Sequence, residues 1–258
     1  MPDRSVILTI VDQTWASPGS ILDLLESFRI GHGTKHFLNH LVIVALDNKA
    51  FHYCNSIYPH CFFLVNTTTP LLTPSLEFKL LEQVIELGYN LFFTDADVMW
   101  FRNPATYIVD MKELEIVCNF YSVDPPSIAS EVDGGFFYLK SNEISLDYFK
   151  YWELKRVLYL NSQNQSLCEA TVTDPSFEMI GFRVKYLEES HFNGFCQQRR
   201  NMSEIVTVHA NCCDSIQSKV HDLKLLHEDW RHFTALSSGK TSLRGSSVTW
   251  RVPSKCKS

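Results

Sequence analysis

The feature of this chain that most restricts its fold is a regular alternation of strand-like and helix-like segments up to residue 94. Short runs of apolar, β-branched residues are typical of buried strands, whereas apolar residues three or four positions apart are typical of helices. Strands joined by single helices form parallel sheets through right-handed crossovers. We therefore expect an α/β fold with a Rossmann-like, mostly parallel sheet flanked by helices. The expected strands cover residues 6–11, 41–46, 62–65 and 89–94, and the expected helices cover 20–29, 48–56 and 74–87.

Signals at both ends support the third helix. Thr73 is a suitable N-cap, and Pro74 suits the first helical position. Gly88 can end the helix in a left-handed conformation.

The second half is less regular. We predict strands at 115–119 and 135–139, then a helix capped by Ser141 that runs to Tyr159. The predicted buried face of that helix consists of Leu146, Phe149, Trp152 and Leu158. A chain of 258 residues fits one large domain, which we assign to residues 1–236. Residues 237–258 are rich in Ser, Thr and Lys and are expected to form a C-terminal tail that packs on the domain or extends from it.

The charge of the chain argues against nucleic acid as a partner. The net charge is −6, and the Arg199–Arg200 pair is too short to form a basic patch.

The eight cysteines form no CxxC pair, so they do not resemble a zinc site. Their even number, together with glycosylation sequons at Asn66, Asn164 and Asn201, favours the secretory pathway. The adjacent Cys212 and Cys213 are expected in disulfides, with Cys196 and Cys256 as candidate partners and a reactive thiol as the alternative. No apolar stretch approaches the ~20 residues of a membrane span, so the protein is either cytosolic or carries an N-terminal anchor outside this sequence.

The chemistry of the chain centres on Asp95-Ala96-Asp97, which follows the fourth predicted strand. On an extended segment, side chains two residues apart face the same side. Two carboxylates that close repel each other unless a cation lies between them, and Mn²⁺ and Mg²⁺ prefer such oxygen ligands. A solvated turn is the alternative, but apolar residues on both sides of the motif favour burial. A bound cation could neutralise a departing diphosphate.

Ligands of open α/β sheets bind beyond the carboxyl ends of the strands. Asp12 follows the first predicted strand and Asp95 follows the fourth, so both are expected near one crevice. For Asp12, contact with a nucleotide and a simple role in the loop that enters the next helix are equally good explanations.

Several blocks of sequence resemble the plant nucleotide-diphospho-sugar transferases, the family 77 glycosyltransferases with a GT-A fold. The longest is GYNLFFTDADVMWFRNP at 88–104, and the others are SFR at 27–29, DGGF at 133–136 with SN at 141–142, GFC at 194–196, HANCC at 209–213 and DWR at 229–231. The resemblance spans about residues 5–256.

The resemblance implies a role for each matching position. Asp97 would ligate a divalent metal, Mn²⁺ or Mg²⁺, and Asp95 would contact the donor ribose or a metal-bound water while helping to hold the metal. His209 matches a histidine that often supplies the third ligand, although a lone histidine is also commonly structural. Asp133 would hydrogen-bond the donor sugar, and Gly134 and Gly135 would let the backbone approach that sugar. A turn before the following strand is the alternative for the two glycines.

The chain departs from the family pattern in two places. Relatives carry an Asp-Gln pair that lines the donor sugar, whereas this chain has Asn164 and Gln165, and Asn164 also begins a sequon. Relatives also have a longer segment with aromatic and basic residues around 69–78, where this chain offers only Lys79 beside Glu77. Gln165, Asn164 and Asp133 remain the candidate residues around the sugar.

The leading hypothesis is a metal-dependent, retaining glycosyltransferase of the Golgi lumen. It would move a sugar from a UDP-sugar to a hydroxyl of a cell-wall glycan or a glycoprotein. The second hypothesis is a catalytically impaired relative that binds a glycan or nucleotide as a partner protein. The third is a phosphatase of the haloacid-dehalogenase type, but its Asp-x-Asp motif normally follows the first strand rather than the fourth.

Overall fold

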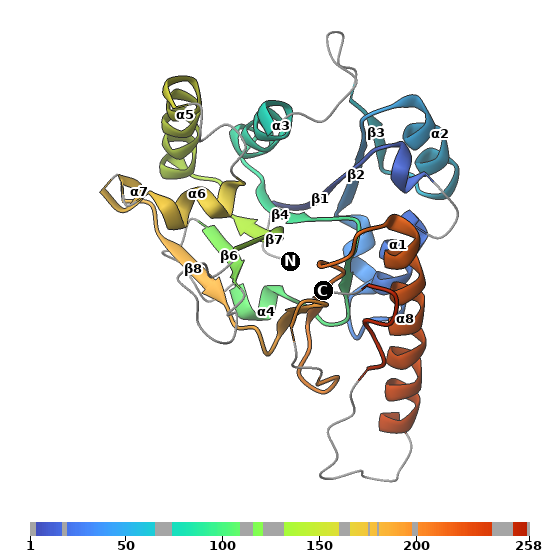
Figure 1. Cartoon of the computed structure of the whole chain (residues 1–258). Helices are drawn as coiled ribbons and strands as arrows, with labels where there is room; N and C mark the ends of the chain where they lie inside the picture. Colours follow the sequence, from blue (N-terminus) through green and yellow to red (C-terminus); the bar gives the residue numbers. More distant parts are fainter. Residues whose placement is uncertain are drawn as a thin grey trace.

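The structure is a computed structural model that describes residues 4–16, 20–64, 74–108, 116–120, 132–159, 166–174, 176–179, 181–197, 201–238 and 250–256. Its centre is a seven-stranded sheet with the order β3-β2-β1-β4-β7-β6-β8 (Figure 1). The strands are β1 (Ser5–Val11), β2 (Leu41–Ala45), β3 (Cys61–Phe63), β4 (Asn90–Thr94), β6 (Ile116–Phe120), β7 (Val132–Leu139) and β8 (Val184–Leu187).

The predicted parallel sheet is confirmed for the first four strands. β1 pairs in parallel with β2 and β4, and β2 pairs in parallel with β3. The second half reverses direction, because β7 is antiparallel to both β4 and β6, and β8 then runs parallel to β6. The sheet is therefore mostly parallel, with β7 as the strand that joins its two halves.

Helices cover both faces of this sheet, which gives three layers (Figure 1). One hydrophobic core includes residues of α1 and α8, and the other includes residues of α3, α5 and α6. The helices are α1 (Ser20–Ile30), α2 (Asn48–Ile57), α3 (Pro74–Glu86), α4 (Ala105–Ile108), α5 (Glu143–Leu158), α6 (Leu167–Thr173), α7 (Ser176–Met179) and α8 (Ile216–Ser238), with short 3-10 helices η1 (Gln13–Trp15) and η2 (Lys35–Asn39).

Alternation of side chains along β4 explains why the two cores are separate. Phe92 packs into the core that contains α1 and α8, whereas Leu91 and Phe93 pack into the opposite core. Successive side chains of a strand point to opposite faces, so a run of apolar residues serves both layers. β4 ends at Thr94, so Asp95 directly follows the strand at the edge of the sheet, between the two helical layers.

A second sheet of three strands lies beside the end of β4. Its order is β5-β10-β9, with β5 at Val98–Trp100, β10 at Thr207–His209 and β9 at Phe192–Gly194. β10 runs antiparallel to β5 and parallel to β9. This small sheet brings the region after Asp97 next to a segment more than a hundred residues later in the chain.

Two details of the predicted helix after β7 were wrong. The N-cap is Asn142, whose side chain accepts from the backbone N–H of Ser145, whereas the Ser141 hydroxyl donates to the carbonyl of Ile85. Phe149 and Trp152 are buried as expected, but Leu158 is 63% exposed because it is the last residue of α5.

The helix α3 ends as the sequence predicted. Gly88 has a φ of +80°, the left-handed conformation that glycine adopts without strain. The predicted cap Thr73 lies outside the described residues. Among the helices that the structure describes, none is long and apolar enough to cross a bilayer.

All eight cysteines are paired in four disulfides, namely Cys54–Cys61, Cys118–Cys168, Cys196–Cys212 and Cys213–Cys256. The two candidate partners of the adjacent cysteines are therefore confirmed, and the reactive-thiol alternative is wrong. The last of the four bridges ties residues 250–256 to the body of the protein, where Trp250 and Val252 are buried. The domain boundary at residue 236 stays a prediction.

A buried carboxylate also anchors the C-terminal segment. Asp222 of α8 is fully buried, and its side chain accepts from the backbone N–H groups of Ser254, Lys255 and Cys256 at 2.8–3.1 Å. Three donors converging on one carboxylate satisfy a charge that would otherwise be costly to bury.

We predict that Asp222→Ala lowers the melting temperature by about 5 °C or more, because three backbone N–H groups of the C-terminal segment lose their acceptor. Thermal unfolding followed by circular dichroism measures the effect. Asp147→Ala is the matched control, since Asp147 has a 66% exposed side chain and pairs with the exposed Lys150. Equal melting temperatures for the two variants would contradict the anchoring role.

Candidate metal centre

The Asp95-Ala96-Asp97 motif is a turn rather than the predicted extended segment. The backbone N–H of Val98 donates to the carbonyl of Asp95 at 3.2 Å, which closes the turn between β4 and β5. The prediction of burial holds for Asp97, whose side chain is 3% exposed, while that of Asp95 is 46% exposed. The turn therefore leaves the Asp95 carboxylate partly exposed and buries that of Asp97.

The small sheet delivers His209 to this turn. His209 is the last residue of β10 and pairs with Val98 of β5, and the next N–H, of Ala210, donates to the carbonyl of Asp97 at 3.0 Å. Apolar side chains of β5 and β10 hold the two strands in the core, since Met99 and Val208 are fully buried. A fixed backbone register therefore sets the distance between the imidazole and both carboxylates.

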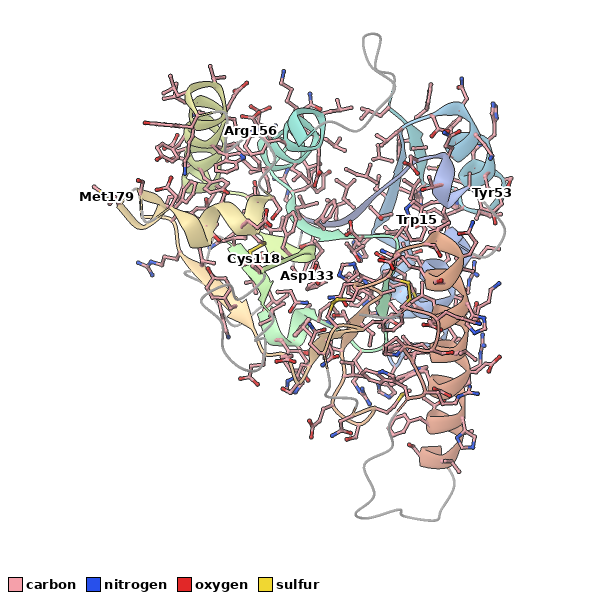
Figure 2. The ribbon with its side chains drawn as sticks, in the orientation of Figure 1. Trp15, Tyr53, Cys118, Asp133, Arg156 and Met179 are labelled. Carbon is pink, nitrogen blue, oxygen red and sulfur yellow. A yellow bond between two sulfur atoms is a disulfide. The ribbon has the colours of Figure 1, made fainter. Side chains whose placement is uncertain are left out.

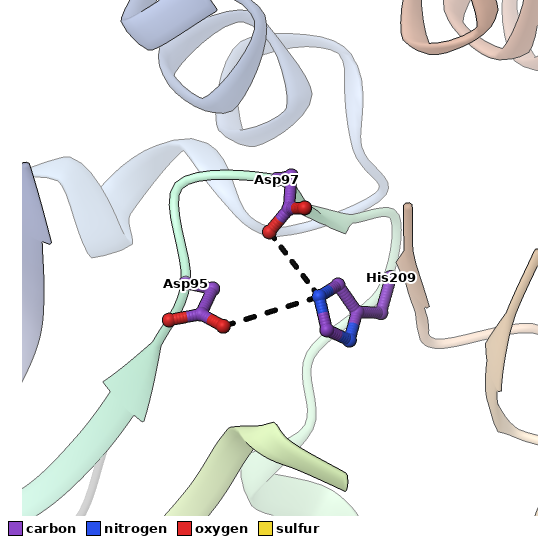
Figure 3. Close-up of side chains that lie close together, drawn as sticks. All are labelled: Asp95, Asp97 and His209. Carbon is purple, nitrogen blue, oxygen red and sulfur yellow. Dashed lines mark ion pairs between the residues drawn. The ribbon is translucent and has the colours of Figure 1, made fainter. Parts of the chain in front are cut away.

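Figure 3 shows how the three side chains converge. His209 Nε2 lies 3.2 Å from Asp97 Oδ1 and 3.9 Å from Asp95 Oδ2. One ligand atom from each residue lies within 4.8 Å of the others. The three residues that the sequence proposed as metal ligands are thus brought together in one place.

Asp133, predicted at the donor sugar, contacts His209 from the other side of the ring. Its Oδ2 lies 2.8 Å from His209 Nδ1, and its Oδ1 accepts the backbone N–H of Gly135 at 2.9 Å. Asp133 lies on β7, is buried, and is labelled near the middle of the view in Figure 2. Contact with a sugar stays a prediction, but the geometry shows a carboxylate directed at the imidazole.

The two glycines after Asp133 lie inside β7, so the alternative of a turn before the strand is wrong. The pairing of β6 with β7 shifts here, since Cys118 faces Phe137 while Asn119 faces Asp133. Glycines within a strand commonly mark such a bulge. Gly134 faces Ser166, and Gly135 faces the metal-site side chains.

Close packing explains why position 135 has no side chain. A Cβ on Gly135 would lie 2.5 Å from His209 Cε1, 2.8 Å from its Nδ1 and 3.0 Å from Asp95 Oδ2. The backbone also contributes, because the Gly135 carbonyl accepts the N–H of Asp95 at 2.7 Å. The bulge therefore supports the imidazole and the Asp95 backbone at the same point.

A cation that the sequence analysis missed lies at the edge of the site. Lys219, in the first turn of α8, places its Nζ 2.5 Å from Asp97 Oδ2, and its side chain is 23% exposed. The only signal in the sequence was a lysine ten positions after His209, at the start of an amphipathic segment. Asp97 thus presents one oxygen to the imidazole and the other to an ammonium group.

The charges of these groups are strongly coupled. Burial alone would raise the pKa of Asp97, but His209 and Lys219 outweigh burial and hold that pKa at about 2. Desolvation and the charge of Asp97 raise the pKa of Asp95. Burial disfavours charged His209, yet Asp133 and Asp97 raise its pKa well above the ordinary value. The site therefore concentrates negative charge that a cation can stabilise.

The residues present fit a divalent metal ion. Two carboxylates and an imidazole form a set of oxygen and nitrogen donors that suits Mn²⁺, and carboxylates suit Mg²⁺. With a metal bound, His209 would be neutral, and its Nδ1–H would donate to Asp133 while the Nε2 lone pair faced the two other carboxylates. Asp97 Oδ1, Asp95 Oδ2 and His209 Nε2 are the atoms that would hold the ion.

The other predicted residues around the donor are less closely tied to this centre. Asp12 caps η1, where its carboxylate accepts from the backbone N–H of Thr14, as the loop alternative required. It follows β1, which is adjacent and parallel to β4, so it lies at the same edge of the sheet as Asp95. Asn164 and Gln165 lie outside the described residues.

We predict that Gly135→Ala removes the stabilisation that Mn²⁺ gives to the folded protein, because the new methyl group displaces the His209 ring. The shift of the melting temperature on adding Mn²⁺ measures this effect. Gly134→Ala is the matched control, since its Cβ would meet Ser166 at 3.3 Å or more. If both variants respond to Mn²⁺ as the parent does, the packing argument is wrong.

Comparison with known proteins identifies relatives among plant sequences. A family model described as nucleotide-diphospho-sugar transferase matches residues 36–223. The Arabidopsis thaliana protein named uncharacterized protein At4g15970 is 31% identical over 271 residues, which cover 98% of this chain and 70% of that protein. A second Arabidopsis thaliana protein, At1g28695, is 31% identical over 252 residues that cover 90% of this chain and 75% of that protein.

Solved structures support the fold. The galactosyltransferase LgtC, solved with donor and acceptor sugar analogues, superimposes with a TM-score of 0.50 at 12% identity, covering 88% of this chain and 99% of that chain. The apo form of the glycosyltransferase GlyE of Streptococcus pneumoniae TIGR4 gives 0.51 at 10% identity, covering 97% and 66%. At such identities the likeness speaks for the GT-A fold alone. The match of the family model over most of the sequence goes further: this chain belongs to the nucleotide-diphospho-sugar transferase family.

Proposed function

We propose that the protein is a metal-dependent glycosyltransferase that moves a sugar from a UDP-sugar to a hydroxyl of a cell-wall glycan or a glycoprotein, with retention of anomeric configuration. The observation that carries the proposal is the convergence of Asp95, Asp97 and His209 at the edge of the sheet. Membership in the family supplies the class of donor, and the three side chains supply a place for its metal.

A divalent metal, Mn²⁺ or Mg²⁺, would supply neutralisation of the charge that develops on the diphosphate as the nucleotide leaves. Asp97 and His209 would hold the ion, and Asp95 would contact it or the donor ribose. Lys219 pairs with Asp97 Oδ2, so its ammonium lies at the same carboxylate and can turn to a phosphate oxygen. This lysine supplies the basic group that the sequence around 69–78 lacked.

Transfer proceeds by a front-face route in the proposal. The acceptor oxygen forms a bond to the anomeric carbon on the face from which the diphosphate departs, and the bond from that carbon to the phosphate oxygen breaks. The hydroxyl proton passes to the leaving phosphate oxygen, which retains the bonding electrons. Gln165 and Asn164 are the residues proposed to line the sugar, and Asp12 with Gly134 and Gly135 is proposed to lie along the donor.

The proposed location is the Golgi lumen. Four disulfides suit an oxidising compartment. The Asn201 side chain of one sequon lies in a turn, where its Oδ1 accepts from Ser203. A lumenal enzyme would meet both a UDP-sugar and a glycan acceptor there.

We predict that Asp97→Ala lowers transfer from the UDP-sugar by at least about 100-fold, since removal of one charge-stabilising group typically costs that much. Thermal shift with a panel of UDP-sugars and Mn²⁺ selects the donor, and release of UDP measures the rate. The anomeric configuration of the product, read by NMR, tests retention.

Two controls accompany this experiment. A chelator should abolish the activity of the parent protein, and added Mn²⁺ should restore it. Asp147→Ala removes an equal charge from the exposed side of α5 and should leave the rate unchanged. A folded Asp97→Ala variant as active as the parent would exclude a catalytic role for the metal site.

We predict that Lys219→Met weakens binding of UDP by about 10-fold or more, because a charge-assisted contact to phosphate is lost. Calorimetric titration with UDP in saturating Mn²⁺ measures the affinity. Lys224→Met, on the exposed side of the same helix, should bind UDP as the parent does. If Lys219→Met binds UDP as tightly as the parent does, Lys219 does not contact the phosphate and only pairs with Asp97.

One pattern of charges favours a second candidate, a catalytically impaired relative that binds a nucleotide or glycan as a partner protein. Lys219 already pairs with Asp97 Oδ2, so its ammonium engages a carboxylate that a metal ion would otherwise bind. Binding of UDP and Mn²⁺ without turnover of any UDP-sugar would favour this candidate over the enzyme.

A further inference from the structure

We infer that Asp133 is a positioning residue for the metal centre, which acts through His209 rather than as a contact to the donor sugar. The inference rests on the proposed metal-dependent function, since it assigns a second layer to the same site. It differs from the role that the family resemblance implied for this position, and three independent observations carry it.

The first observation is the contact itself. Asp133 Oδ2 lies 2.8 Å from His209 Nδ1, and both side chains are at least 89% buried. A metal-binding histidine usually donates its second ring N–H to a carboxylate or a carbonyl, which fixes the ring and makes the ligating nitrogen more basic. Because Nδ1 is engaged, Nε2 is the nitrogen that faces Asp97 and Asp95.

The second observation is how Asp133 is itself held. Its Oδ1 accepts the backbone N–H of Gly135, so the carboxylate is fixed by the bulge of β7 before it meets the imidazole. A carboxylate with one oxygen on the backbone and the other on the ring has a defined orientation. Asp133 therefore links β7 of the main sheet to His209 of the small sheet through these two hydrogen bonds.

The third observation is the space around the ring. His209 lies against Gly135 so closely that a Cβ there would meet two ring atoms at 2.5 Å and 2.8 Å. The ring is thus confined by the glycine and by its hydrogen bond with Asp133. One short segment, 133–135, supplies both the hydrogen bond and the space that orient the ligand.

The test measures the affinity for Mn²⁺ alone, with no nucleotide present, from the free Mn²⁺ signal in electron paramagnetic resonance. We expect Asp133→Ala to weaken Mn²⁺ binding by about 10–100-fold, the usual effect of removing such an outer partner. Asp133→Asn keeps an acceptor oxygen without the charge, so it should lose less. Asp147→Asn, which changes an exposed carboxylate on α5, should bind Mn²⁺ as the parent does.

The outcomes separate the two roles of Asp133. If folded Asp133→Asn and Asp133→Ala variants bind Mn²⁺ as the parent does while the KM for the donor rises, Asp133 contacts the sugar and the inference is overturned. If Asp133→Ala fails to fold, Asp133→Asn decides by the same measurement. A parent protein that binds no Mn²⁺ would overturn the inference together with the proposed function, whereas unchanged binding in the variants alone would leave that function standing.

Discussion

Mutual repulsion among acidic side chains is the constraint around which this structure is organised. Asp95, Asp97 and Asp133 all lie against one imidazole, and Lys219 pairs with Asp97. Negative charges this close are stable only with positive groups between them. Folding therefore has to bring His209 and Lys219 from the last quarter of the chain to a turn in its first half. The architecture meets this requirement with a second sheet and a long helix.

The pairing of strands in the two sheets sets the positions of the side chains at the site. β4 ends at the motif, β7 lies beside it with a bulge, and β10 returns alongside β5 with His209 opposite Val98. Backbone hydrogen bonds and buried apolar side chains hold each of these strands in place. The core therefore determines where the carboxylates and the imidazole lie. A change in register by one residue would turn His209 to the other face.

Much of the fold could be predicted because its signals are local. Apolar runs located β1 to β4, and Gly88 located the end of α3. The ligand set was predicted through the family resemblance, and the structure brings those residues together. The turn at Asp95–Asp97 was not predicted, and an extended segment was expected in its place, because a three-residue link between strands can turn without leaving a distinct pattern. Lys219 was missed for a related reason, since only the packing of α8 determines which of its side chains reaches Asp97. The contact between Asp133 and His209 was not predicted either. It depends on the bulge in β7, which can be recognised only once the pairing of β7 with β6 is known.

The adjacent cysteines carry a consequence for making the protein. Cys212 and Cys213 bond to different partners, one in the loop after β9 and the other in the segment after α8. The four sulfurs of these two bridges allow three connectivities. If Cys212 and Cys213 exchanged partners, each bridge would move by only one residue along the chain. Cys213 would then hold the loop after β9, and Cys212 would hold the segment after α8. Shuffled isomers could therefore keep the main sheet yet displace the loop that follows His209. Material from a reducing host needs peptide mapping of these two bridges before its metal chemistry is interpreted.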